Sequence, residues 1–346
     1  MEMEKKVILV IDDEEMNLMR VKNILKDEYQ VVAVKSGEQG LKYLDCHMPD
    51  MILLDIMMPK ISGWDVMREI QKSKILSKVP VIFLTADNNP ETEKKCFDYH
   101  AVDFCAKPIQ KEVLLARIRR NLELEGYRKH LEDIVENQKN QIYQMKYEFI
   151  VSMANLVDNR DGSTGEHVKR TAYYVWCMGK ALKERGMYPE IVTDRYVANL
   201  KMAAPMHDIG KISISDLILN KPGKLTPEEF DLMKQHTVYG EKVIRDTLGN
   251  IEDADFLEMV CDIALYHHEK YNGKGYPKGL QGEEIPLSAR IMAIADVYDA
   301  LKERRVYKDA FPLEEVYAIM NEDSGSHFDP EILKVFMDIR DEIEKK

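Results

Sequence analysis

Seven residues between positions 167 and 296 have the types and spacing of a metal site. They include one adjacent histidine–aspartate pair and one adjacent histidine pair. Asp296 lies in the apolar stretch AIADVYDAL, where burying an unpaired carboxylate is costly unless a cation compensates its charge. Five histidines and two aspartates can supply about seven ligands, enough for two octahedral ions completed by water and substrate. The seven are His167, His207, Asp208, His236, His267, His268 and Asp296.

A pair of metal ions at such a site can activate water for hydrolysis. Two metal ions about 3.5–4 Å apart neutralise charge on the phosphoryl oxygens and lower the pKa of a bridging water toward ~7. Mixed histidine and carboxylate ligands suit divalent iron, manganese, cobalt or zinc better than magnesium, and we favour iron or manganese. Asp208 can bridge two metals through its two oxygens. Lys211, one helical turn further on, can bind a phosphate oxygen or the bridging hydroxide, so Asp208 and Lys211 are both candidate catalytic residues.

The elements that position these residues fall into two regions of different character. Residues 1 to about 120 alternate short β-branched runs with segments of helical periodicity, which predicts a five-stranded parallel sheet covered on both faces. After Val151 the strand signals stop, and the pattern predicts helices joined by loops. The predicted fold class is therefore an α/β doubly wound domain followed by an all-α domain. The predicted strands are 7–11, 30–34, 51–55, 81–85 and 102–106.

Five side chains at the carboxyl ends of these strands suit phosphoryl chemistry. Three carboxylates at one sheet edge repel one another, and Mg²⁺ would compensate them because it prefers hard oxygen ligands and keeps waters for phosphate. Asp55 can then act as a nucleophile toward a phosphoryl group. Lys107 and the Thr85 hydroxyl can hold the phosphoryl oxygens. The five are Asp12, Asp13, Asp55, Thr85 and Lys107.

A long helix is predicted between the two regions. From Ile118 to about Phe149 there is no proline and a single glycine, and two offset series of residues recur every seven positions. This heptad pattern favours a parallel dimeric coiled coil, and a lone helix packed on the second domain is the alternative. The two series are Leu124, Leu131, Gln138 and Met145, and Arg128, Val135, Ile142 and Phe149.

Composition limits the partners and the compartment. The formal net charge of −12 disfavours nucleic acid and anionic membrane as partners, so an anionic substrate must be held by local cations or metals. The five cysteines form no CxxC pair, as expected of reduced cysteines in a cytoplasmic protein. No apolar run approaches the roughly 20 residues of a membrane span. We expect a cytoplasmic protein that binds neither DNA nor membrane.

Residues 5 to about 122 resemble the response-regulator receiver family. The matching words are VIDDE, LLDIMMPKISG, FLTA and AKP. The resemblance implies that Asp12, Asp13 and Asp55 bind Mg²⁺ and that a histidine kinase phosphorylates Asp55. It also implies that Thr85 and Lys107 read the phosphoryl group, with Phe104 as the switch aromatic. A pocket that is intact but not phosphorylated in the cell is the alternative.

Residues 150 to about 340 resemble the HD-GYP subgroup of the HD phosphohydrolase superfamily. The matching words are TGEHVKR, HDIGK, KPGKLT, MKQHTVYGEKVI, HHEKYNGKGYP, ARIMAIADVYDAL and HFDPEIL. The resemblance implies hydrolysis of cyclic di-GMP to pGpG, GMP or both. It assigns one metal to His167, His207, Asp208 and Asp296. It assigns the other to Asp208, His236, His267 and His268.

The same resemblance implies how substrate and partners bind. Arg305 and Lys308 match positions that hold substrate phosphate, although LKERR at 301–305 departs from the family pattern and a solvated basic turn is the alternative. Ser163 replaces a glutamate that helps some members hold a third metal, which favours a binuclear centre. Gly275-Tyr276-Pro277 (GYP) is expected to be a rigid loop near the site and a candidate docking surface.

The expected organisation is a receiver domain (1–122), a helical linker (123–150) and an HD-GYP domain (151–346). Two alternatives to cyclic di-GMP hydrolysis stay open. One is turnover of a related cyclic dinucleotide or another nucleotide. The other is a receptor or adaptor that binds without hydrolysis through the GYP loop.

Overall fold

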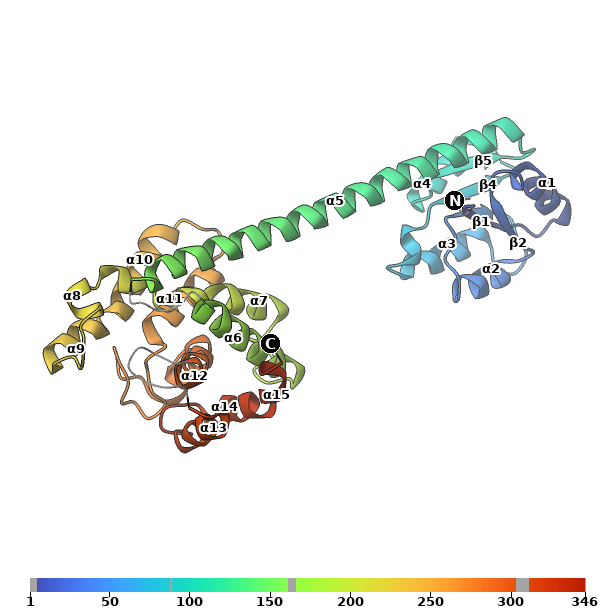
Figure 1. Ribbon diagram of the computed structural model, residues 1–346. Coiled ribbons are helices and arrows are strands. Elements are labelled where there is room, and N and C mark those ends of the chain that lie inside the picture. The colour runs from blue at the N-terminus through green and yellow to red at the C-terminus, as the bar shows by residue number, and fades with distance from the viewer. Residues whose placement is uncertain (1–4, 88, 161–165, 303–310, 346) are drawn as a thin grey trace. The chain divides into compact units, whose positions relative to one another are not determined.

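The computed structural model describes residues 5–87, 89–160, 166–302 and 311–345. The chain divides into two compact units, Met1–Lys139 and Asn140–Lys346, which are described separately below. Figure 1 shows their elements. Arg305, Lys308 and Ser163 lie outside the described residues.

The first unit is a five-stranded parallel sheet in the order β2-β1-β3-β4-β5. The central strands β1, β3 and β4 are almost entirely buried, because helices cover both faces of the sheet. Helix α1 and the first turns of α5 pack on one face, and α2, α3 and α4 pack on the other. The predicted α/β fold is confirmed. The strands are β1 (Val7–Ile11), β2 (Gln30–Val34), β3 (Met51–Asp55), β4 (Val81–Thr85) and β5 (Asp103–Ala106). The helices are α1 (Glu15–Leu25), α2 (Gly37–Leu44), α3 (Gly63–Lys72), η1 (Leu76–Lys78) and α4 (Pro90–Asp98).

Helix α5 (Lys111–Asp158) is a single uninterrupted helix of 48 residues, so the predicted long helix is confirmed. Its first turns bury Leu114 and Ile118 in the first unit, and its last turns bury Val151 and Ala154 in the second. Six apolar residues of the predicted heptad series are each more than half exposed: Leu124, Leu131, Val135, Ile142, Met145 and Phe149. The coiled-coil dimer stays a prediction.

The second unit is helical, as predicted, and contains no β-strand among its described residues. Its core lies among α6, α11 and α12, whose inward faces are fully buried. No described helix is long and apolar enough to cross a bilayer. The elements are α6 (Glu166–Glu184), α7 (Asp194–Ala203), η2 (Ala204–Met206), η3 (Ile209–Ser213), α8 (Asp216–Leu219), α9 (Pro227–Lys234), α10 (His236–Leu248), α11 (Ala254–Tyr266), η4 (Gly282–Glu284), α12 (Leu287–Lys302), α13 (Leu313–Glu322), α14 (Pro330–Asp338) and α15 (Arg340–Ile343).

Candidate functional site

The second unit brings all seven predicted metal-binding residues into two neighbouring clusters. They come from the start of α6, the η2–η3 junction, the start of α10, the end of α11 and the middle of α12. Within each cluster, the atoms able to bind a metal all lie within 4.8 Å of one another. One cluster is Asp208, His236, His267 and His268, and the other is His167, His207 and Asp296.

Asp208 lies between the two clusters. Its Oδ1 is 3.3 Å from His236 Nε2 and 3.7 Å from His267 Nε2. Its Oδ2 is 3.4 Å from His207 Nε2 and 2.7 Å from Lys211 Nζ. Because one carboxylate oxygen faces each cluster, Asp208 has the orientation of a bridging ligand.

In three of the histidines, a backbone carbonyl binds one ring nitrogen and leaves the other available to bind a metal. The Nδ1 atoms of His207, His236 and His267 lie 3.0, 2.8 and 2.9 Å from the carbonyl oxygens of Ala204, Met233 and Ile263. A carbonyl can only accept, so each Nδ1 must bear the proton and each neutral ring has its lone pair on Nε2. Burial lowers the pKa of His207 to about 4, which keeps this ring neutral near pH 7, as metal ligation requires.

These nitrogens face a carboxylate without a donor between them. Within the described part of the chain, the Nε2 atoms of His207, His236 and His267 and Oδ1 of Asp208 are buried and have no hydrogen-bond partner. Lone pairs that face one another in a buried site are costly unless a cation lies between them. The residues therefore fit a divalent metal ion in each cluster.

The charges of the site are balanced in part by Lys211. Burial raises the pKa of Asp208, but the Lys211 ammonium and the three neighbouring histidines together outweigh this effect and hold the pKa well below its usual range. Asp208 is therefore ionised when Lys211 lies against it. A bound cation would compete with Lys211 for the same carboxylate.

Asp299 is a part of the site that the sequence interpretation missed. Its Oδ2 accepts from His167 Nδ1 at 2.7 Å, and its two oxygens accept from Arg170 at 2.7 and 3.0 Å. The carboxylate is 2% exposed. It fixes the His167 ring so that Nε2 points to Asp296, 3.7 Å away. The signal that was available is its spacing, since Asp299 lies one helical turn after Asp296 on the same apolar helix.

The GYP loop forms a rim beside the histidines. The Tyr276 ring lies 4.9 Å from the His268 ring and 6.4 Å from the Phe230 ring, and Lys234 Nζ lies over both Phe230 and Tyr276. Glu269, which is 2% exposed, fixes the end of the loop by accepting from three successive backbone amides, 278–280, at 2.7–3.1 Å. An aromatic and cationic rim is suited to a nucleotide base.

The first unit gathers the predicted phosphoryl pocket at the carboxyl edge of its sheet. Asp12, Asp13 and Asp55 offer oxygens within 4.8 Å of one another. Lys107 Nζ lies 2.9 Å from Asp12 and 3.0 Å from Asp55. Burial raises the pKa of Asp55 to about 6, against the opposing effect of Lys107. These four groups form a compact site for Mg²⁺ and phosphate.

The two predicted switch residues lie at the end of β4 and on β5. The Thr85 hydroxyl donates to the carbonyl of Asp87 and accepts from its amide, at 3.1 and 3.0 Å. The Phe104 ring is half-buried, edge-on to Phe97 and 5.4 Å from the Arg117 guanidinium. None of these contacts involves Asp55.

Comparison with known proteins identifies both domains of the chain. The family description "HD domain" matches residues 131–332, and "Response regulator receiver domain" matches residues 8–119. The chain belongs to the HD-domain family. It is an HD-domain response regulator, as predicted from its motifs.

Three relatives align with almost the whole HD-domain chain. A Vibrio cholerae protein named "Probable cyclic di-GMP phosphodiesterase" is 38% identical over 95% of this chain and 77% of its own length. A Thermotoga maritima "Cyclic di-GMP phosphodiesterase" is 33% identical over 97% and 91%. The Xanthomonas campestris "Cyclic di-GMP phosphodiesterase response regulator RpfG" is 30% identical over 98% and 89%.

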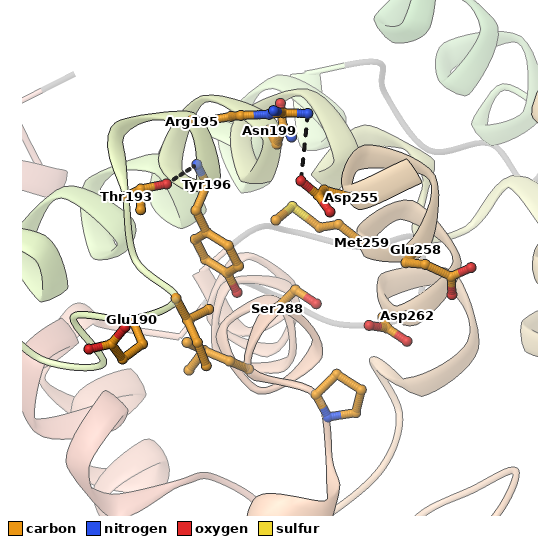
Figure 2. Close-up of a pocket in the computed structure, with 13 residues that line it drawn as sticks. Glu190, Thr193, Arg195, Tyr196, Asn199, Asp255, Glu258, Met259, Asp262 and Ser288 are labelled. Atoms are coloured by element: carbon orange, nitrogen blue, oxygen red, sulfur yellow. Dashed lines mark hydrogen bonds and ion pairs between the residues drawn. The ribbon is translucent and has the colours of Figure 1, made fainter. Parts of the chain in front are cut away.

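A separate pocket of about 530 Å³ lies in the HD domain among α7, α11 and the start of α12 (Figure 2). Its rim includes Arg195, which pairs with Asp255 at 3.6 Å, and its interior includes Tyr196, Asp262 and Ser288. None of its lining residues belongs to the metal clusters. We therefore assign no part of the reaction to this pocket.

Proposed function

We propose that this HD-domain response regulator hydrolyses cyclic di-GMP to pGpG, GMP or both, under the control of phosphorylation at Asp55. The observation that supports this most directly is the position of Asp208, with one oxygen toward each of two histidine clusters. The names of the three relatives support the choice of substrate.

We propose that two metal ions, iron or manganese, bind this site, and that Mg²⁺ binds the receiver pocket. His167, His207, Asp208 and Asp296 would hold one ion in the HD domain. Asp208, His236, His267 and His268 would hold the other. When bound, such a pair supplies an activated water and neutralises the phosphodiester charge.

The surrounding residues bind and orient the substrate. Lys211 lies at the edge of the site, with its side chain 20% exposed. It would bind a phosphate oxygen when a metal ion binds the Asp208 carboxylate in its place. The Phe230 and Tyr276 rings would stack on a guanine base. Arg305 and Lys308 are proposed as further phosphate-binding residues.

A receptor that only binds cyclic di-GMP does not need this arrangement. Binding requires contacts to the bases and phosphates, whereas the buried lone pairs of three histidines beside Asp208 serve a cation. The complete ligand set therefore favours an enzyme over an adaptor.

Several partners follow from the same proposal. The receiver domain implies a phosphodonor, and we propose a histidine kinase. The exposed apolar series on α5 supports a homodimer through that helix, and the GYP loop is a candidate docking surface for another protein. A cytoplasmic location is supported by the cysteines, all five of which are free thiols.

The test is a turnover assay on purified protein loaded with Mn²⁺ or Fe²⁺. Chromatography should show conversion of cyclic di-GMP to a linear product, and a chelator should abolish it. Asp208→Ala should be inactive, whereas Asp246→Ala, which removes an exposed carboxylate from α10, should match the wild type. A mixed guanine–adenine cyclic dinucleotide as competitor measures the substrate preference. Tight binding of cyclic di-GMP without hydrolysis under any metal condition would favour the receptor instead.

A further inference from the structure

Arg160 connects the end of helix α5 to the segment that follows the His207-Asp208 pair. It lies two residues beyond the last residue of α5, and its amide still donates to Val157 O at 3.1 Å. Its guanidinium donates to the carbonyls of Lys211, Ile212 and Ile214 at 3.2, 2.8 and 3.2 Å. A fourth bond, at 2.7 Å, goes to the side chain of Asp216. One side chain thus holds the backbone from 211 to 214.

The held segment is confined on its other side by α10. A Cβ atom on Gly210 would lie 1.9 Å from the carbonyl oxygen of His236 and 2.4 Å from the amide of Gly240, so η3 and the start of α10 are in direct backbone contact. The segment therefore has little freedom, and its position depends on Arg160 on one side and α10 on the other.

This segment determines where Lys211 lies. The Lys211 ammonium is 2.7 Å from Asp208 Oδ2, and Asp208 immediately precedes η3. A shift of the backbone at 211–214 would move Lys211 relative to the carboxylate that faces both clusters. The planar guanidinium fork of Arg160 holds several acceptors at fixed angles, so it transmits a displacement better than a flexible ammonium would.

Helix α5 connects the receiver unit to Arg160 through one continuous helix. It begins at Lys111, directly after the receiver sheet, and continues without a break to Asp158. Rotation or translation of such a helix at its first turns is carried along its length, because its backbone hydrogen bonds form a continuous ladder. Arg160, two residues after the end of α5, is bonded to the backbone of the 211–214 segment.

We propose that Arg160 is the positioning residue through which the state of Asp55 reaches Lys211 and Asp208. This inference rests on the proposed function, since it concerns the regulation of that site. Among the described residues, the Arg160 guanidinium is bonded to the backbone of 211–214 and to Asp216, so it acts by setting the position of the η3 segment.

The test compares kcat and KM for cyclic di-GMP with and without beryllofluoride, which mimics a phosphoryl group on Asp55. The wild type should change by roughly 5- to 150-fold between the two states, the usual range of allosteric coupling. Arg160→Ala should reduce this ratio to less than about twofold, and Arg160→Lys should give an intermediate ratio. Metal content should be unchanged in both variants. Arg185→Ala is the matched control, because Arg185 forms an exposed pair with Asp338 in the same unit.

A second measurement does not depend on turnover. Hydrogen exchange of the amides at 209–214 should change on adding beryllofluoride in the wild type and in Arg185→Ala, and should not change in Arg160→Ala. The inference would be overturned if Arg160→Ala kept the wild-type ratio of rates and the wild-type change in hydrogen exchange. It would also be overturned if beryllofluoride changed neither the rate nor the exchange of the wild type. Absence of any turnover together with the expected exchange pattern would instead count against the proposed reaction.

Discussion

Replacing Asp55 with asparagine is expected to stabilise the receiver unit at neutral pH. The Asp55 side chain is almost fully buried and shares the Lys107 ammonium with Asp12, so one cation faces two carboxylates. Burial raises the pKa of Asp55 from an ordinary value of 3.8 to about 6, because Lys107 offsets only part of the cost. Asparagine keeps the shape of the side chain and removes the charge.

The sign and size of the effect follow from this pKa. A carboxyl whose pKa is higher in the folded than in the unfolded protein destabilises the fold as pH rises, beginning near the lower value and ending above the higher one. The difference between 3.8 and about 6 corresponds to about 3 kcal/mol. Screening by water at the open side of the pocket reduces this to about 1–2 kcal/mol. The increase in the free energy of unfolding caused by Asp55→Asn should reach its full value at pH 7.5 and about half of that value at pH 5.

The assay uses the tryptophan of the receiver unit as its reporter. Trp64 packs 4.7 Å from Phe83, and the second tryptophan of the chain, Trp176, lies in the other unit. In a Trp176→Phe background, urea unfolding followed by tryptophan fluorescence in the presence of EDTA reports the receiver alone. Adding Mg²⁺ should shrink the gain, because the cation compensates the wild-type carboxylate. Equal or lower stability of Asp55→Asn at pH 7.5, or a gain that grows toward pH 5, would refute the reasoning.

Three further predictions concern the HD domain and the linker helix. Asp299→Asn should weaken metal binding by about 10- to 100-fold, measured by titration calorimetry, because the histidine it orients loses its carboxylate partner; unchanged affinity would contradict this. Phe230→Ala should raise KM for cyclic di-GMP about tenfold with little change in kcat. Leu232→Ala, at a neighbouring exposed position, should leave KM unchanged. The same KM in the two variants would exclude stacking on Phe230. Polar substitutions at Leu131 and Ile142 together should convert a dimer to monomers in light scattering. A wild type that is monomeric at micromolar concentration would refute the coiled coil.

The sheet was predictable from the sequence because its strands are short β-branched runs with chemically distinct ends. β1, β2, β3 and β4 have the predicted bounds, and β5 differs by one residue. Parallel topology then brings the ends of separate strands to one edge, which is why Asp12 and Asp55 could be placed together before any coordinates. Candidate metal-binding residues could be recognised because histidine and aspartate stand next to each other in pairs such as His207-Asp208. Their division into two metal sites came from the resemblance to the HD-GYP subgroup.

The supporting contacts were not predictable, because they join residues far apart in the chain. His167 and Asp299 are 132 positions apart, and Arg160 and Lys211 are 51 apart. Nothing in a local pattern links such pairs; only the packing of α6 on α12, or of the end of α5 on η3, brings them together. The heptad pattern ends at Phe149, whereas α5 continues to Asp158. Its last turns are stabilised by burial of residues such as Ala154 in the HD domain, which the heptad pattern does not indicate.

Counting metal ions per chain tests the central claim most directly. Elemental analysis of protein reconstituted with Mn²⁺ should give two ions in the wild type, about one in His268→Ala and in Asp296→Ala, and almost none in Asp208→Ala, since that residue faces both clusters. Activity on cyclic di-GMP should be lost in all three variants. Two ions retained in Asp208→Ala, or three in the wild type, would contradict a binuclear centre bridged by this aspartate.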